Sequence, residues 1–423
     1  VRGWFTAGVV VGVVVGLGAT AFVLWNCVRS LAAVFSVSAA AREVAATMTP
    51  LVPGVTLPWE EAGSMFVAVA VAVVWHEAGH ALAAVVEGVH VRSVGLLLIG
   101  VVPGAYVHMG TDLDARPPVP RLRVIYAGVW HNVVLVLGCV AALMSAPMWL
   151  SPAFRVGDGV AIGRIPPGSA FGDALAVGDV ITHVNHVQVG STAEWQAALE
   201  ALMPGDGDNP RQFGLCGVSG GLPPTPDLDG GCCGRQAGPR HLCFLLGLTG
   251  DGGFSCADAK QVALDSTAAC DSTSPDCPPG TTCVRPQSPD AGMRLFALRL
   301  RNGTTAAFAG TPGHLYAAFT PTDWSLRPGM RVTQHALSGV LSRPVLRWVD
   351  GIPVAATAFL RLLILVSSSM AVFNAAPVWF TDGDHATRVA IVWLQHRLHA
   401  SFPGFRLPMH TAATVLKVCS TMF

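Results

Sequence analysis

The sequence predicts a polytopic α-helical membrane protein with a cysteine-rich β domain inserted between its membrane segments. Of its 423 residues, 52% are hydrophobic and only 12% are charged, whereas soluble globular chains carry about 25% charged residues. Four apolar segments are long enough to cross a bilayer, and eight of the eleven cysteines lie together between the third and the fourth. The formal net charge is zero, so the composition indicates no nucleic-acid partner.

The candidate spans all reach the ~20 residues that a transmembrane helix needs. They are residues 5–28, 63–86, 122–150 and 354–380. A signal peptide is the alternative for the first, but its apolar core would have only about 7–15 residues. Residues 96–107 are too short to cross, and Pro103 and Gly104 favour a re-entrant or interfacial hairpin. Residues 386–396 and 407–423 are apolar but short, which leaves the number of C-terminal spans open.

The second span contains the sequence His76-Glu77-Ala78-Gly79-His80. Residues four apart on a helix differ by about 40° in direction, so the two imidazoles point to one side and can bind one ion. Zinc favours such a pair together with a third protein ligand. The intervening Glu77 can take a proton from the attacking water and pass it to the leaving amine. A chance pattern would be disfavoured here, since a charged group in a span costs about 2.5–3.5 kcal/mol.

A third ligand is expected at the end of the fourth span, in residues 374–383. Pro377 interrupts the helix and Gly383 permits a tight turn, so Asp382 lies on a bent segment able to reach inward. A carboxylate would complete a site for one zinc ion. Asp384 and His385 are close competitors, whereas Asp350 precedes the span and is expected at the opposite membrane face.

The region between the third and fourth spans is rich in glycine, proline and cysteine. Its cysteines are Cys216, Cys232, Cys233, Cys243, Cys256, Cys270, Cys277 and Cys283. Their even number predicts disulfides and an oxidising lumen, although a zinc ribbon is the alternative. The sequon that begins at Asn302 agrees with a luminal side. The arginines at 116, 121 and 123 then lie before or at the start of the third span on the cytosolic side, as the positive-inside rule expects. The active site accordingly faces the cytosol, and Cys27, Cys139 and Cys419 are expected to be buried thiols.

Residues 159–202 resemble a PDZ domain. A short β run, a Pro-Gly turn, the segment Gly178-Asp179-Val180-Ile181 and an amphipathic helix follow one another. A PDZ groove binds a peptide as an added strand, so the domain would hold or exclude substrate. A structural β domain without a free groove is the alternative. The fold class expected is therefore a polytopic α-helical membrane protein with an inserted luminal PDZ-like, cysteine-rich β domain. Its predicted parts are 1–62 (first span and loop), 63–150 (first half of the catalytic core), 151–353 (luminal, with an insert at about 205–292) and 354–423 (second half of the core).

The pattern HExxH at 76–80 followed by NxxPxxxxDG at 374–383 resembles the site-2 protease family of intramembrane zinc metalloproteases, in particular its eukaryotic membrane-bound transcription factor branch. Further similarity lies at Val52-Pro53-Gly54, Pro103-Gly104-Ala105-Tyr106, residues 127–132, and Cys232, Cys233, Cys243 and Phe244. The chain departs from the family at Thr381, usually Leu, and at Trp379, often Pro. The helix that the family has after the Asp-Gly turn is expected to be poorly formed.

The resemblance implies regulated intramembrane proteolysis. An upstream protease trims the luminal part of a substrate, and this enzyme then cuts the remaining membrane helix to release tethered transcription factors, including sterol-regulatory and stress-response ones. It implies an endomembrane location, in the Golgi or ER. It also favours a role for Asn132 with the substrate carbonyl or the oxyanion, although an interhelical hydrogen bond is the alternative. Asn374 would either contact substrate or cap the broken helix.

Other functions remain open from the residues alone. One is a membrane-anchored zinc protease acting on soluble or misfolded proteins. Another is a non-enzymatic PDZ-like membrane adaptor or a metal transporter, but Glu77 and Asp382 are intact and the sequence has no inverted repeat. The hairpin near 91–107 offers an intramembrane protease a strand edge for an unwound substrate, because a helix hides its scissile carbonyl in hydrogen bonds.

Overall fold

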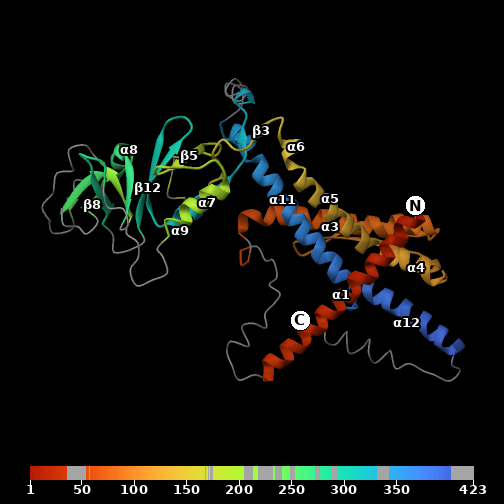
Figure 1. Cartoon of the computed structure of the whole chain (residues 1–423). Helices are drawn as coiled ribbons and strands as arrows, with labels where there is room; N and C mark the ends of the chain where they lie inside the picture. Colours follow the sequence, from red (N-terminus) through yellow and green to blue (C-terminus); the bar gives the residue numbers. More distant parts are fainter. Residues whose placement is uncertain are drawn as a thin grey trace. The chain divides into compact units, whose positions relative to one another are not determined.

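A computed structural model describes most of the chain and divides it into two compact units (Figure 1). The first comprises Val1–Ser145 with Thr357–Phe423, and the second comprises Ala146–Ala356. Each unit is considered by itself. The described residues are 1–35, 54–56, 58–166, 168–169, 171, 175–203, 213–217, 232–233, 241–247, 253–271, 277–287, 293–330 and 343–401.

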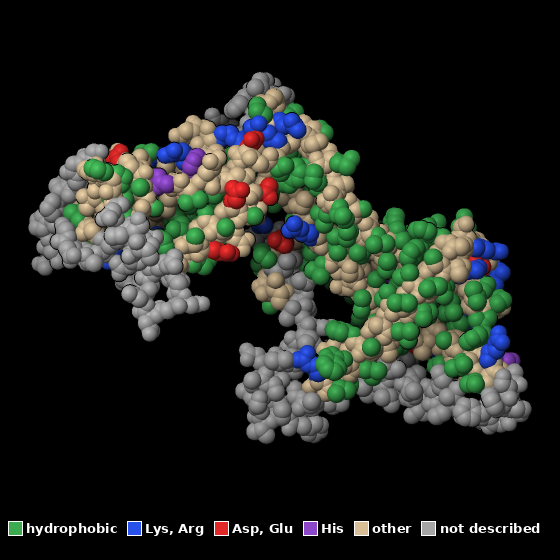
Figure 2. All heavy atoms as spheres, viewed as in Figure 1, with side chains coloured by type: hydrophobic (Ala, Val, Ile, Leu, Met, Phe, Trp, Pro, Cys, Tyr) green, Lys and Arg blue, Asp and Glu red, His purple; other side chains and the backbone are tan. Residues whose placement is uncertain are grey.

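Four helices are long and apolar enough to cross a membrane. They are α1 (Arg2–Phe35), α3 (Ala62–Glu87), α5 (Ala127–Met144) and α11 (Arg343–Ala375). Their membrane-length parts are Arg2–Arg29, Ala62–Glu87, Ala127–Met144 and Trp348–Ala375. Hydrophobic side chains cover much of the visible surface of these helices, as lipid-facing helices require (Figure 2). The described part of the chain therefore contains four apolar helices of membrane length, the number predicted.

The third predicted span, 122–150, is wrong as a single helix. It consists of α4 (Pro118–Ile125), α5 and α6 (Ala146–Leu150). The chain leaves regular helix at Tyr126 and again at Ser145, whose ψ angles are near zero. The Ser145 hydroxyl donates to the carbonyl of Ala141, four residues earlier, which satisfies one of the terminal carbonyls of α5.

The predicted hairpin is present. Strands β1 (Val91–Ile99) and β2 (Val102–Met109) pair antiparallel, with Ile99 opposite Val102. Gly100 has φ +62°, as the first residue of a two-residue type II′ turn requires. The closing pair of such a hairpin is hydrogen-bonded, so alternate residues from Pro103 onward turn their backbone nitrogens outward. Proline lacks an N–H and is tolerated there without losing a bond to β1.

The helix after the Asp-Gly turn is well formed, contrary to expectation. Helix α12 (Asp382–Ser401) has 20 residues but does not meet the criteria for a membrane span. Thr381, the departure from the family pattern, explains its start. The Thr381 hydroxyl donates to the carbonyls of Ala376 and Val378 and lies 3.4 Å from the backbone N–H of Asp384. The second apolar stretch, 407–423, lies outside the described residues. Two short 3₁₀ helices, η1 (Trp59–Glu61) and η2 (Thr111–Leu113), complete this unit.

The second unit contains a six-stranded antiparallel sheet in the order β13-β12-β5-β4-β14, with β6 beside β5. Its elements are β4 (Val160–Arg164), β5 (Val180–Val184), β6 (Val187–Gln188), α7 (Thr192–Glu200), β12 (Arg294–Leu300), β13 (Thr305–Gly310), α9 (Pro312–Ala317) and β14 (Thr320–Thr322). A small sheet pairs β3 (Phe154–Arg155) with β15 (Ser325–Leu326). Trp195, Phe296 and Leu298 are fully buried in the core of the larger sheet.

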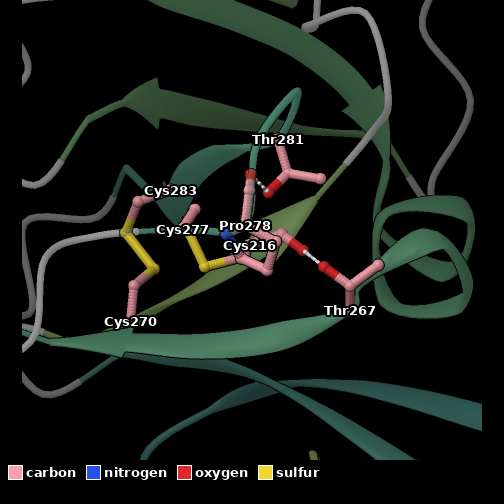
Figure 3. Close-up of a disulfide and its surroundings, with 7 residues drawn as sticks. All are labelled: Cys216, Thr267, Cys270, Cys277, Pro278, Thr281 and Cys283. Atoms are coloured by element: carbon pink, nitrogen blue, oxygen red, sulfur yellow. Dashed lines mark hydrogen bonds between the residues drawn. A yellow bond between two sulfur atoms is a disulfide. The ribbon is translucent and has the colours of Figure 1, made fainter.

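A second sheet of the same unit is held by disulfides. Its order is β10-β7-β11-β8-β9, formed by β7 (Phe213–Gly217), β8 (His241–Leu246), β9 (Phe254–Asp258), β10 (Ala268–Asp271) and β11 (Thr282–Pro286), with α8 (Ala259–Asp265). All eight cysteines pair: Cys216–Cys277, Cys232–Cys243, Cys233–Cys256 and Cys270–Cys283. Figure 3 shows two of these bonds next to each other. The disulfide interpretation is therefore confirmed over the zinc ribbon. Cys27 and Cys139 are buried thiols, as predicted, and Cys419 lies outside the described residues.

Candidate metal centre

The site begins with helix α3, which directs two imidazoles to the same side. The Nε2 atoms of His76 and His80 lie 3.1 Å apart, and their rings meet edge to face. Both side chains are buried. This is the arrangement that the four-residue spacing predicts.

Two glycines allow α3 and α5 to approach closely enough to enclose these rings. A Cβ on Gly128 of α5 would lie only 2.5 Å from Nε2 of His76 and still closer to Nε2 of His80. A Cβ on Gly79 of α3 would lie 2.6 Å from the carbonyl oxygen of Ala127. Small residues at a crossing are the usual means by which membrane helices pack tightly. Gly128 therefore borders the space between the two Nε2 atoms.

Asp382 reaches the imidazoles from the first turn of α12. Its Oδ2 lies 3.1 Å from Nε2 of His76 and 3.3 Å from Nε2 of His80. The chain between α11 and α12 is compact because Gly383 packs directly against the carbonyls of Ala375 and Ala376, where a Cβ has no room. Asp382 thus approaches from a segment of chain about 300 residues away, as the sequence predicted.

The three ligand atoms fit a divalent metal ion. A tetrahedral zinc with bonds of about 2.0–2.1 Å places its ligand atoms roughly 3.3 Å apart, and the three observed separations are 3.1, 3.1 and 3.3 Å. Oδ2 of Asp382 has no hydrogen-bond donor in the described part of the chain beyond these imidazoles.

The far side of each imidazole ring also has a partner. Nδ1 of His80 lies 2.8 Å from the carbonyl oxygen of Val124 and donates to it. Nδ1 of His76 lies 3.1 Å from Nδ2 of Asn132, which is completely buried. These contacts orient both rings with Nε2 toward Asp382. Partners of this kind fix ring orientation in metal sites.

Glu77 lies beside this cluster, on a cavity of about 450 Å³. Val107, whose backbone nitrogen turns to the outer edge of β2 by alternation, lines the same cavity. The cavity is lined by Glu77, His80, Val107, Met109, Leu113, Asp114, Arg121, Ile125, Asp382, His385 and Arg388. The outer edge of β2 therefore borders the same space as the candidate acid/base and two of the candidate metal ligands.

Asn374, His131 and Asp384 do not belong to the His-His-Asp cluster. Asn374 is half-buried in the last turn of α11, and no hydrogen bond in the described residues joins it to the His-His-Asp cluster. His131 donates to the carbonyl of Ala127 and stacks on Phe5, so its role is in packing. Asp384 pairs with Arg388 instead of facing the imidazoles.

Sequence reasoning missed Gly128 and the Val124 carbonyl. A Gly-xxx-Asn spacing with Asn132, in a span adjacent to the histidines, was the available signal for Gly128. Every residue has a backbone carbonyl, so the residue type at position 124 gave no signal for this contact.

Four membrane-length helices with a buried His-His-Asp cluster and an adjacent glutamate define a membrane metallopeptidase class. The model of Peptidase family M50 matches residues 64–405, and this chain belongs to that family. The chain is also 36% identical over 83 residues to a membrane-bound transcription factor site-2 protease homolog of Arabidopsis thaliana. That match spans 20% of this chain and 16% of the plant protein. The family resemblance seen in the sequence is thereby confirmed.

Proposed function

We propose that this chain is an intramembrane zinc endopeptidase that cleaves the membrane helices of tethered transcription factors, after another protease has made a first luminal cut. The observation that carries the proposal is the convergence of His76, His80 and Asp382 at ligand-atom separations of 3.1–3.3 Å, beside Glu77 and on a membrane-length helix. Membership of Peptidase family M50 and the similarity to the plant site-2 protease homolog support the reaction and the substrate class.

The chemistry divides among the residues of the chain. His76, His80 and Asp382 would hold the ion, and zinc supplies Lewis acidity toward water and the scissile carbonyl. Glu77 faces the cavity but is not part of the cluster, so its carboxylate is free to accept the proton of the attacking water and to deliver it to the leaving amine.

Strand β2 is the element that would present an unwound substrate to this site. In the described residues β2 pairs only with β1, so its outer edge carries unpaired backbone groups. By alternation, Ala105 turns its N–H to this edge, next to Val107 at the cavity. An extended substrate segment added to β2 would exchange helical hydrogen bonds for strand bonds. Leu97 and Val101 lie on β1 and in the turn, so a proline at either position would not test this edge.

The matched test of this edge uses two proline substitutions. Ala105→Pro removes an outward N–H from β2, whereas Leu96→Pro, at the position directly opposite, removes one from the far edge of β1. We expect Ala105→Pro to slow cleavage and Leu96→Pro to leave it close to wild type, with zinc content unchanged in both. Equal cleavage rates in the two variants would refute the proposal that β2 binds the unwound substrate.

The second unit would lie in the lumen of the Golgi or ER. Its four disulfides support an oxidising compartment. We place the PDZ-like module in the sheet of β4, β5 and β12 with α7, where it would hold substrate or exclude substrates whose luminal part is uncut.

The decisive experiment for the reaction is Glu77→Gln in the full chain reconstituted in lipid vesicles with a tethered helical substrate. Loss of a general base lowers the rate by about 10²–10⁴-fold, while bound zinc stays at the wild-type level. Glu61→Gln, just before α3 and outside the cavity lining, is the matched control and should retain the rate. Normal cleavage by Glu77→Gln would refute the role. Cleavage of a soluble unfolded protein but not of the helix would favour the membrane-anchored alternative.

A further inference from the structure

Asn132 makes a contact that an oxyanion-binding residue would not need. Its Nδ2 lies 3.1 Å from Nδ1 of His76, on the ring edge away from Asp382. The Asn132 side chain is completely buried, and its Oδ1 has no hydrogen-bond partner in the described part of the chain. Its own backbone carbonyl accepts from the hydroxyl of Ser367 on α11, which is also completely buried. The side chain of Asn132 thus contacts His76, while its backbone carbonyl is bonded to Ser367.

The two histidines of the cluster differ in their second partners. The Val124 carbonyl can only accept, so Nδ1 of His80 carries its hydrogen and Nε2 is left for an ion. An amide side chain can either donate or accept. With Nδ2 toward His76 it donates to Nδ1, and with Oδ1 in the same place it accepts from Nδ1–H. A half-turn of the amide exchanges these two arrangements.

We propose that Asn132 is a positioning residue for His76. An imidazole that gives its Nε2 lone pair to a metal keeps its hydrogen on Nδ1, and that N–H needs an acceptor in a buried site. Oδ1 of Asn132 is the unsatisfied acceptor within reach after the half-turn. The amide therefore holds the His76 ring in place both with and without the ion. This inference rests on the proposed metal site.

The test compares Asn132→Leu, which removes the hydrogen bond, with Asn132→Asp, which retains the acceptor in the same shape. Zinc affinity is measured by competition with a chelator, and cleavage is measured separately at saturating zinc. We expect Asn132→Leu to weaken zinc binding about 10–100-fold, as losses of such partners do, and Asn132→Asp to bind within a few-fold of wild type. Near-normal zinc binding by Asn132→Asp would also show that the fold tolerates a substitution at this position.

An oxyanion role gives the opposite pattern. Both variants would then bind zinc normally and both would lose turnover, because neither side chain can donate to an oxyanion. Wild-type zinc affinity in Asn132→Leu would overturn the inference while leaving the proposed function intact. If the wild-type chain itself binds no zinc, the proposed function fails first and this inference falls with it.

An independent observation concerns Asn302, at the tip of the β12–β13 hairpin. Asn302, Gly303 and Thr304 are all exposed, and Gly303 has φ +84°. The backbone N–H and the hydroxyl of Thr304 both donate to Oδ1 of Asn302, at 2.9 and 2.7 Å. The turn therefore brings together the amide and the hydroxyl that define an N-x-Thr acceptor, with the Asn side chain at the surface.

We infer that Asn302 carries an N-linked glycan. The sequence contains no other N-x-Ser/Thr pattern, so a single glycan is expected. The four disulfides of the same unit support a compartment in which N-glycosylation also takes place. The attached sugar would project from a hairpin end and leave the sheet pairing of β12 and β13 undisturbed.

The test is the gel mobility of the full chain made in eukaryotic cells, before and after digestion with an N-glycosidase. We expect one digestible shift in the wild type that is lost in Thr304→Ala and kept in Thr305→Ala, the adjacent threonine outside the sequon. No shift in the wild type, or a shift that survives Thr304→Ala, would overturn the assignment. Neither outcome bears on zinc binding or cleavage, so the proposed reaction is tested separately.

Discussion

Replacing Gly128 by alanine is the most demanding test of the geometry. The added Cβ would lie 2.5 Å from Nε2 of His76 and nearer still to Nε2 of His80. Van der Waals contact needs about 3.5 Å or more, so the rings must retreat by roughly 1 Å. They cannot do so freely, because Val124 and Asn132 hold their far edges. Metal–ligand distances tolerate only about 0.2 Å. Since the loss of one outer partner alone costs about 10–100-fold in affinity, we expect at least 100-fold weaker zinc binding.

Chelator competition on purified protein measures this effect directly. Gly138→Ala is the matched control, because it lies on the same helix and a Cβ there meets no atom within 4 Å. The control should bind zinc as the wild type does and gain slightly in helix stability, since alanine is favoured over glycine by about 1 kcal/mol. Wild-type zinc affinity in Gly128→Ala would mean that the ion does not lie between these rings, and the assignment of His76 and His80 would be withdrawn.

Three further substitutions test the contacts that stabilise the two units. Gly383→Ala should displace Asp382 and reduce bound zinc, whereas Gly18→Ala on α1, which meets no atom within 4 Å, should not; metal analysis of both variants decides this. Trp195→Ala removes a side chain that is 1% exposed and should lower stability by about 3–5 kcal/mol, seen as a lower unfolding midpoint of the β unit. Replacing Cys270 and Cys283 together by serine should cost about 2–5 kcal/mol, and an unchanged midpoint under oxidising conditions would contradict the bond between them.

The parts of the site that could be predicted are those encoded by residue type and local spacing. His76 and His80 follow from helix periodicity, and the reach of Asp382 follows from the helix break that Pro377 imposes. The hairpin is predicted from a short apolar run with Pro103 and Gly104, and the structure places its turn at Gly100 and Val101. In each case one segment of sequence contains the whole signal.

The parts that escaped prediction depend on contacts between segments. The interruption of the third span at Tyr126 falls within the uncharged stretch 124–130, which contains no proline to indicate a break. The hydrogen bond that Asn132 makes to His76 depends on how closely α3 and α5 cross. Thr381 departs from the family pattern, yet its hydroxyl lies 3.4 Å from the backbone N–H of Asp384 and so caps the start of α12.

The order of strands in the larger sheet constrains how the chain can fold as it is made. Strand β5 is flanked by β4 and β12, yet the cysteine-rich sheet lies between β5 and β12 in sequence. During synthesis β5 therefore emerges long before β12, and one of its edges has no partner until the segment with all eight paired cysteines has passed. Closing so long a loop is slow. Oxidation of the cysteines can thus proceed while the neighbouring sheet is still open, and that exposed edge is where a chaperone would be needed most.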